Sequence, residues 1–139
     1  MKLKNIDIIG IISSLHDFSQ KKLPQKVSYA ITKNQLKLDR EIECYQTELQ
    51  KLFSKYNDHI SKDENGEYIN NSQGIPEFKE ESVVERNEFI GELNELLSIE
   101  NDVDLYLVDD ELLNYDDNGV YDVLTPSEIS YLYRVLCKK

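Results

Sequence analysis

Apolar residues recur at helical spacing over much of the chain, and this pattern predicts its main elements. Near the N-terminus they fall at Ile8, Ile11 and Leu15, which share one side of a helix. Asn5 precedes them and belongs to the residue types that favour the start of a helix. The sequence therefore predicts a helix over residues 5–19.

A much longer helix is predicted over residues 24–56, with Pro24 in its first turn, where no N–H is needed. From Leu38 to Tyr56 the apolar positions alternate between spacings of four and three, as in a coiled-coil seam. Asn34 falls on this stripe, where it either fixes the packing register or lies where the stripe meets solvent. The seam residues that could mediate self-association are Ile31, Leu38, Ile42, Tyr45, Leu49 and Leu52.

The polar stretch 58–76 contains Asn65–Gly66, a strong turn signal, and predicts a loop or a short exposed hairpin. An acidic helix is predicted over residues 77–98, with its start either near Pro76 or at Ser82. Ser82 and Glu85 have the spacing of a capping box, in which each side chain binds the other residue's backbone N–H.

Short strands are predicted within residues 103–124. Val103, Leu105 and Leu107 alternate with polar residues, so this stretch favours a strand with these side chains facing inward. A second strand is predicted over residues 119–124, after a turn.

The last predicted helix covers residues 126–137. Thr125 is a good N-cap, Pro126 suits the first helical position, and Glu128 completes a capping box. Together these elements predict a single α+β domain over residues 1–139 that is mainly helical. It combines a long helical hairpin, an acidic third helix, a small two-stranded sheet and a capped C-terminal helix.

The net charge of −11 is unevenly distributed. Residues 1–40 carry eight Lys and Arg against three Asp and Glu, whereas residues 41–139 carry eight against 24. Such a field repels nucleic acid and membrane phosphates and attracts basic protein surfaces. The basic N-terminal part could also bind the acidic part of a second copy, so a homo-oligomer is one expectation.

No stretch of about 18 consecutive apolar residues occurs, so no membrane span is predicted. The N-terminal apolar run contains Asp7 and leads into His16 and Asp17 without a small-residue cleavage site. These features disfavour a secretion signal and predict a cytoplasmic protein.

The predicted acidic helix carries like charges three and four residues apart, which destabilise a helix unless packing or a partner compensates. Regularly spaced carboxylates on a rigid helix can imitate a run of phosphates and occupy a basic nucleic-acid channel. The acids either only keep the protein soluble or form a partner-binding face. The predicted members of that face are Glu80, Glu81, Glu85, Glu88, Glu92, Glu95, Glu100, Asp102 and Asp104.

No metal site, cofactor or catalytic site is predicted. Residues 114–125 resemble a calcium loop, but its first and last positions hold Asn114 and Thr125 in place of carboxylates. No motif supplies an activated nucleophile. Cys44 and Cys137 are expected to be reduced, partly buried thiols. The protein is therefore expected not to be an enzyme.

A basic cluster near the start of the long helix could contact phosphates, but the overall charge favours a solvated face and argues against direct nucleic-acid binding. Its alternative role is to pair with the chain's own acidic helix. The cluster comprises Lys21, Lys22, Lys26, Lys33, Lys37 and Arg40, with Tyr29 among them.

Four stretches resemble small uncharacterised proteins encoded by phages and prophages of Gram-positive bacteria. They are KLPQKVSYAITKN, KLFSKYNDHISKDENGEY, NEFIGELNELLSIENDVDL and LTPSEISYL. The shared motifs are mainly helix starts and turns, so no functional residue is carried over. This chain departs from the group in NNSQGIPEFKEESVVE and NYDDNGVYDV.

The resemblance implies a protein that acts in the cytoplasm of a bacterial host. Phage proteins of this size include inhibitors of host defence, among them anti-CRISPR proteins, and accessory proteins of virion assembly. The leading expectation is a non-catalytic inhibitor whose acidic face binds a basic host protein, such as a nucleic-acid-guided nuclease. The alternative is an assembly protein that self-associates through its helical seam.

Overall fold

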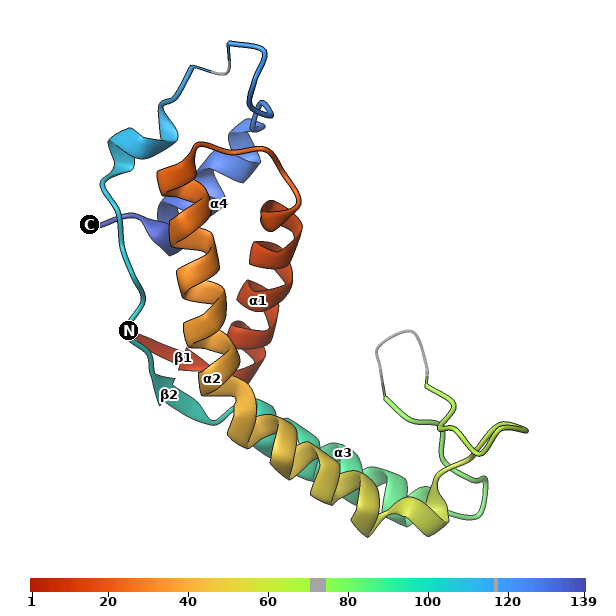
Figure 1. The fold of residues 1–139 in the computed structure, drawn as a ribbon. Helices are drawn as coiled ribbons and strands as arrows, with labels where there is room; N and C mark the ends of the chain where they lie inside the picture. The colour runs from red at the N-terminus through yellow and green to blue at the C-terminus, as the bar shows by residue number, and fades with distance from the viewer. Residues whose placement is uncertain (71–74, 117) are drawn as a thin grey trace. The chain divides into compact units, whose positions relative to one another are not determined.

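The structure is a computed structural model that describes residues 1–70, 75–116 and 118–139 (Figure 1). Within these residues it contains four α-helices and one antiparallel sheet of two strands. The α+β, mainly helical fold is therefore confirmed. The elements are β1 (Lys2–Lys4), α1 (Asn5–Ser19), α2 (Gln25–Lys55), α3 (Val83–Leu97), β2 (Glu100–Asp102) and α4 (Pro126–Leu136).

The chain divides into two compact units. The first unit comprises Met1–Glu43 and Glu100–Lys139, and the second unit comprises Cys44–Ile99. Helix α2 contributes residues to both units. None of the described helices is both long enough and apolar enough to cross a membrane.

In the first unit, α1 and the first part of α2 form a helical hairpin, with α4 beside it (Figure 1). Ile8, Leu15, Ile31, Leu38 and Leu132 are fully buried in this unit. Burial of each such side chain contributes about 1.5–3 kcal/mol. The apolar periodicity of the sequence thus becomes the aliphatic core of the first unit.

The small sheet forms where the chain enters α1. Strand β1 pairs antiparallel with β2, so Lys2 lies opposite Asp102 and Lys4 opposite Glu100. The strand predicted to start at Val103 corresponds to β2, which starts three residues earlier, at Glu100. The strand that pairs with β2 is β1, which has only three residues. Such a segment is too short for the alternation of apolar and polar residues to predict it.

Asn34 attaches the segment after β2 to α2. Its side chain is fully buried; Nδ2 donates to the carbonyl of Tyr106 at 2.9 Å, and Oδ1 accepts from the Tyr106 N–H at 2.7 Å. The amide thereby satisfies both polar groups of one peptide, as a neighbouring strand would. The expectation that Asn34 meets solvent is therefore wrong. Val103 and Leu105 are buried as predicted, but Leu107 is only half-buried.

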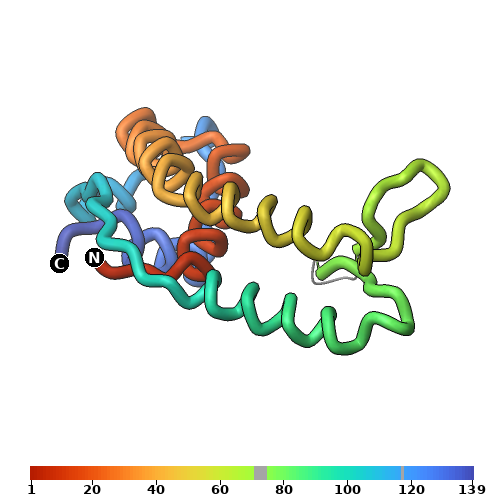
Figure 2. The backbone as a smooth tube through the Cα atoms, turned by 90° about the horizontal axis from the view of Figure 1, so that it is seen from below, coloured from red at the N-terminus to blue at the C-terminus, as the bar shows by residue number. Residues whose placement is uncertain are grey.

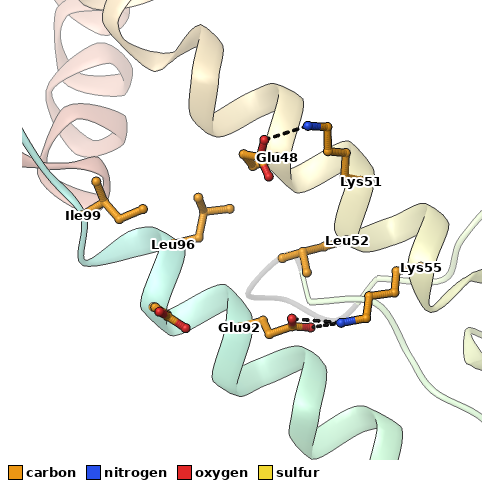
Figure 3. Close-up of a pocket in the computed structure, with 8 residues that line it drawn as sticks. Glu48, Lys51, Leu52, Lys55, Glu92, Leu96 and Ile99 are labelled. Atoms are coloured by element: carbon orange, nitrogen blue, oxygen red, sulfur yellow. Dashed lines mark hydrogen bonds and ion pairs between the residues drawn. The ribbon is translucent and has the colours of Figure 1, made fainter.

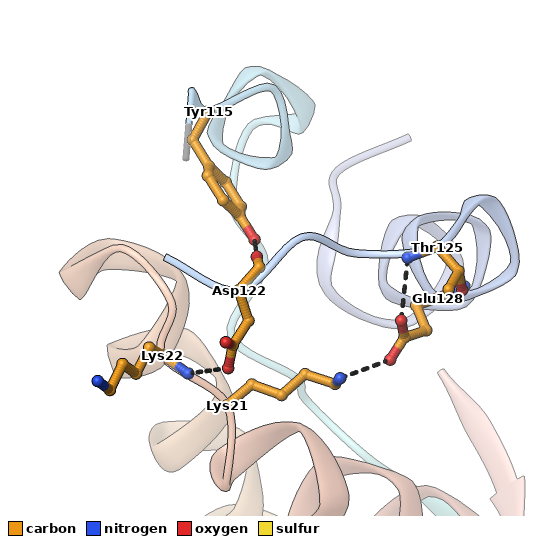
Figure 4. Close-up of polar contacts among 6 residues, drawn as sticks. All are labelled: Lys21, Lys22, Tyr115, Asp122, Thr125 and Glu128. Carbon is orange, nitrogen blue, oxygen red and sulfur yellow. Dashed lines mark hydrogen bonds and ion pairs between the residues drawn. The ribbon is translucent and has the colours of Figure 1, made fainter. Parts of the chain in front are cut away.

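Residues 119–124, the second predicted strand, form a turn and an irregular segment. Asp122 fixes this segment to the connection between α1 and α2 (Figure 4). Its N–H donates to the Lys22 carbonyl at 2.8 Å, and its carboxylate accepts from the Lys22 N–H at 2.7 Å. The Tyr115 hydroxyl donates to the Asp122 carbonyl at 2.9 Å. These contacts replace the pairing that the strand prediction required.

Helix α4 begins as the sequence predicts. The Glu128 N–H donates to the Thr125 hydroxyl at 3.2 Å, and the Thr125 N–H donates to the Glu128 carboxylate at 2.9 Å. These bonds satisfy two backbone donors that the first turn leaves without helical partners. Lys21 adds an ion pair to Glu128 at 3.2 Å (Figure 4). The same carboxylate therefore caps α4 and ties it to the end of α1.

In the second unit, the later part of α2 runs alongside α3 (Figures 1 and 2). Phe89 of α3 is fully buried, and its ring centroid lies 5.7 Å from Tyr56, 5.3 Å from Phe78 and 5.6 Å from Phe53. These edge-on and tilted arrangements are the favoured ones for aromatic rings. Ile60 completes an aromatic core that differs from the aliphatic core of the first unit.

The segment between α2 and α3 contains the predicted hairpin. Asn65 and Gly66 form the turn, and Lys62 pairs antiparallel with Tyr68. Gly66 has a φ of 77°, a backbone conformation that glycine adopts without steric cost. Residues 71–74 of the predicted loop lie outside the described residues.

Helix α3 begins at Val83, directly after Ser82, so the predicted start at Ser82 is confirmed and the earlier one near Pro76 is wrong. Ser82 precedes it, but the Ser82 hydroxyl lies 2.9 Å from His59 Nδ1 and makes no cap hydrogen bond. The expected capping box with Glu85 is therefore absent. The Ser82 hydroxyl bonds to His59, 23 residues earlier in the chain, in place of a backbone N–H of α3. The spacing of residues near Ser82 cannot predict this choice of partner.

Candidate protein-binding surface

The structure places the nine predicted binding acids in two groups, one in each unit. Glu85, Glu88, Glu92 and Glu95 lie on α3 at spacings of three and four, so they form one stripe, here named the acidic stripe. Glu80 and Glu81 are exposed but precede the helix, so their assignment to the acidic helix is wrong. The other three acids belong to the first unit.

The three acids of the first unit lie in and after β2. Glu100 faces Lys4 across the sheet, and the Asp102 carboxylate lies 3.5 Å from the terminal amine of Met1. At Asp104 the backbone carbonyl, not the carboxylate, accepts a hydrogen bond from Lys37 at 2.9 Å. Asp102 and Glu100 thus have basic neighbours within their own unit.

A groove of about 330 Å³ lies between α2 and α3 in the second unit (Figure 3). Leu52 and Leu96 form apolar parts of its lining, and Ile99 at its end is 47% exposed. Charged side chains complete the lining: Glu48, Lys51, Lys55, Glu92 and Glu95. The groove therefore combines apolar surface with carboxylates of the acidic stripe.

Glu92 links the stripe to α2. Its carboxylate accepts a hydrogen bond from the Tyr56 hydroxyl at 2.6 Å and from Lys55 Nζ at 3.0 Å. The bond from Tyr56 and the ion pair with Lys55 both hold the pKa of Glu92 below its ordinary value. The same bonds to Glu92 raise the pKa of Tyr56 and of Lys55. Glu92 thus stays ionised and positions α3 against α2.

The other carboxylates of the stripe remain available. Within the ranges 1–70, 75–116 and 118–139, Glu85, Glu88 and Glu95 form no ion pair. Glu88 and Glu95 are exposed, and Glu85 is half-buried. Of the cations in the groove, Lys51 pairs with Glu48 at 2.9 Å. Three carboxylates of the stripe, on either side of Glu92, are therefore at least partly exposed and form no ion pair within the described residues.

Sequence reasoning missed the separate role of Glu92. Tyr56 and Glu92 are 36 residues apart, so their spacing in the sequence does not predict that they are in contact. A usable signal was present in the placement of Tyr56 at the end of the apolar stripe of α2. A buried tyrosine needs a partner for its hydroxyl, and the nearby acidic helix offers one.

The predicted seam divides into two parts. Ile31, Leu38 and Ile42 are buried, at 0%, 0% and 3% exposed. Tyr45, Leu49 and Leu52 are half-buried. The chain itself covers the first part, so only the second part offers apolar surface to another molecule.

Among the described residues, no three His, Cys, Asp or Glu side chains come together as a metal site. In the segment that resembles a calcium loop, Asp117 lies outside the described residues, and Asp122 binds the Lys22 backbone. Both cysteines are free; Cys137 is buried and Cys44 is exposed, so the expectation of partial burial fails for each. Burial, reinforced by Asp110 and Asp109, raises the pKa of the Cys137 thiol.

Comparison of the chain with protein-family models, with curated proteins and with solved structures finds no match. The similarity to phage-encoded proteins therefore stays a prediction. The functional interpretation rests on the acidic stripe, the groove beside it and the contacts of Glu92.

Proposed function

We propose that the chain is a non-catalytic protein-binding module. In this proposal α3 docks its acidic stripe, together with the adjoining groove, on a surface of the partner that is basic and partly apolar. The observation that carries the proposal is the row formed by Glu85, Glu88 and Glu95 beside the apolar lining of Leu52 and Leu96. These acids are exposed or half-exposed and form no ion pair with any described residue.

The energetic cost of the stripe supports a use beyond solubility. Neighbouring carboxylates three or four residues apart each destabilise a helix by about 0.2–0.5 kcal/mol. Solubility is served equally well by acids interspersed with bases over the surface. Lys55 and Tyr56 compensate Glu92 alone. A basic partner would turn the remaining repulsion into attraction.

The linear arrangement of the stripe supports a partner that binds nucleic acid. Along the helix axis Glu85 and Glu88 are about 4.5 Å apart, and Glu88 and Glu95 are about 10.5 Å apart. Channels for nucleic acid are lined by Lys and Arg that neutralise phosphates, and a row of carboxylates can bind the same side chains. In the specific form of the proposal, the partner is a host defence protein such as a nucleic-acid-guided nuclease, and the chain blocks its channel.

Charge substitution tests the proposal. The triple variant E85K/E88K/E95K reverses the free carboxylates and leaves Glu92 in place. Its matched control is E64K/E67K/E77K, which changes three exposed acids of the same unit by the same total charge. The tagged proteins are used to capture partners from bacterial lysate, and affinity is then measured with the purified partner.

The wild type and the control should bind alike, whereas reversal of the stripe should weaken binding about a hundredfold or more, because each close charge pair at an interface contributes about 1.5 kcal/mol or more. Nucleic acid should compete with the chain for the partner. Equal binding by all three proteins would contradict the proposal.

A second candidate function is assembly through helical self-association. It is favoured by Tyr45, Leu49 and Leu52, which leave part of the seam half-exposed. The test substitutes Tyr45 and Leu49 with Ser, because Ile42 is buried and a polar residue there would damage the fold. A monomeric wild type at high concentration would contradict this candidate.

A further inference from the structure

Four basic side chains lie along one flank of α2 in the first unit. At about 100° per residue, Lys26, Lys33, Lys37 and Arg40 fall within an arc of about 60° on the helix. These four residues are here named the basic stripe. Tyr29 and Leu36 follow one edge of it and are 54% and 67% exposed.

The first unit uses this surface only in part. Lys33 Nζ lies 4.6 Å from the ring centre of Tyr106, and Lys37 Nζ donates to the Asp104 carbonyl at 2.9 Å. Lys26 and Arg40 are exposed and form no ion pair in the parts of the chain that the structure describes. No carboxylate of the helix falls within the arc, although Glu41, Asp102 and Asp104 line the same shallow hollow as Lys33, Lys37 and Arg40.

Helix α3 has the complementary pattern. Its acidic stripe spans an arc of about 80°, with Val84 and Gly91 along one edge. Val84 is 65% exposed, and a Cβ at Gly91 would meet no atom within 4 Å, so this edge is open. Val84 and Gly91 are seven residues apart, as are Tyr29 and Leu36.

The order of the two patterns determines how such helices could pair. Viewed from the N-terminus of each helix, the apolar edge lies on the same side of the charged stripe. Antiparallel packing therefore brings charge against charge and apolar edge against apolar edge, whereas parallel packing does not. With Leu36 opposite Val84, Tyr29 falls opposite Gly91. In this arrangement Lys26 comes next to Glu95 and Lys33 next to Glu88, each one residue from the position directly opposite.

We infer that the basic stripe on α2 of one copy binds the acidic stripe on α3 of a second copy, with the two helices antiparallel. The net charge repels copies over long distances, but that repulsion is screened beyond about 8 Å at physiological salt, where the local contacts persist. The contact uses the acidic stripe that the proposed function gives to a basic partner, so partner binding and self-association exclude one another. The inference itself needs only the purified chain.

Sedimentation velocity on the purified chain tests the inference at about 0.15 M and about 1 M NaCl. Self-association should appear at the lower salt and weaken about tenfold or more at the higher salt, as expected for a charged interface. The variants K26E/K33E and E88K/E95K should each lose it, whereas E64K/E67K should keep it. Circular dichroism confirms that each variant folds.

The decisive sample is an equimolar mixture of K26E/K33E and E88K/E95K. Each variant alone presents like charges at the contact, but the mixture restores opposite charges, so a heterologous complex should form. A chain that stays monomeric at millimolar concentration would overturn the inference, as would a mixture that does not associate. Binding of single-stranded DNA that is lost in K26E/K33E, without self-association, would instead assign the basic stripe to nucleic acid.

Discussion

The two units of the chain use their polar side chains differently. In the first unit, Asn34 and Asp122 bind backbone groups of distant segments and hold irregular chain against the helices. In the second unit, Glu92 of α3 accepts a hydrogen bond from Tyr56 of the same unit. The other three acids of the stripe are exposed or half-exposed. The inward polar contacts hold the fold together, whereas the outward row forms no ion pair among the residues that the structure describes. This difference indicates where binding is to be sought.

The largest expected effect is on the core of the second unit. Phe89→Ala removes a fully buried ring from an aromatic cluster and should destabilise the protein by about 3–5 kcal/mol. Hydrogen exchange of the backbone amides measures which unit responds. Protection should fall over residues 78–97, with residues 5–38 less affected. Equal loss in both ranges would show that the two cores unfold as one, which removes the basis of the comparison.

A somewhat smaller effect is expected in the first unit. Asn34→Ala leaves the N–H and carbonyl of Tyr106 without their partner and should cost about 2–4 kcal/mol. Urea unfolding measures the loss, and Asn87→Ala, at an exposed site on α3, serves as the control. A loss below that of the control would mean that Asn34 does not hold the segment.

Tyr56→Phe isolates the inward contact of the acidic stripe. It removes the hydrogen bond to Glu92 and should cost about 1.5–3 kcal/mol, as for bonds to charged groups. Because the pKa of Glu92 is lowered in the folded state, its contribution is complete above the unfolded value, near 4.3, and is lost as pH falls through the folded pKa.

The variant should therefore lose less stability than the wild type on acidification from about pH 5 to 3, a window set by the carboxyl pKa. Denaturant unfolding at several pH values measures this. Parallel pH curves would show that Tyr56 has no influence on the ionisation of Glu92.

The smallest effect concerns the outward edge of α3. Gly91→Ala adds a Cβ that meets no neighbouring atom, within a helix where glycine costs about 0.8–1.0 kcal/mol relative to alanine. Thermal unfolding should therefore show a modest stabilisation. If the variant is less stable than the wild type, the outer surface of α3 is not open.

Local signals in the sequence were sufficient to predict α1, α2 and α4. Thr125 and Glu128 predict the start of α4 correctly. The spacing of apolar residues predicts the bounds of α1 and α2 to within one residue. The acidic stripe was visible in the same way, because its residues lie close together on one helix. These features depend on neighbours within a few residues, which a sequence displays directly.

Contacts between distant residues account for what could not be predicted. The Ser82 hydroxyl lies against His59, so the predicted capping box of α3 does not form. Asn34 binds a peptide 72 residues away, and Glu92 binds Tyr56 across two helices. In each case a polar group has several potential partners, and only the tertiary structure decides among them. Sequence reasoning could therefore identify the row of acids but not the member that the fold uses.

The measurement that most directly tests the role of α3 compares neutralised acids in the two units. The variants E85Q/E88Q/E95Q and E100Q/D102N/D104N remove three charges each, and their affinities for the captured partner are measured by titration calorimetry. The account predicts that the α3 variant binds at least about tenfold more weakly than the wild type, whereas the β2 variant stays close to it. Equal loss in both variants, or loss in the β2 variant alone, would contradict a binding surface on α3.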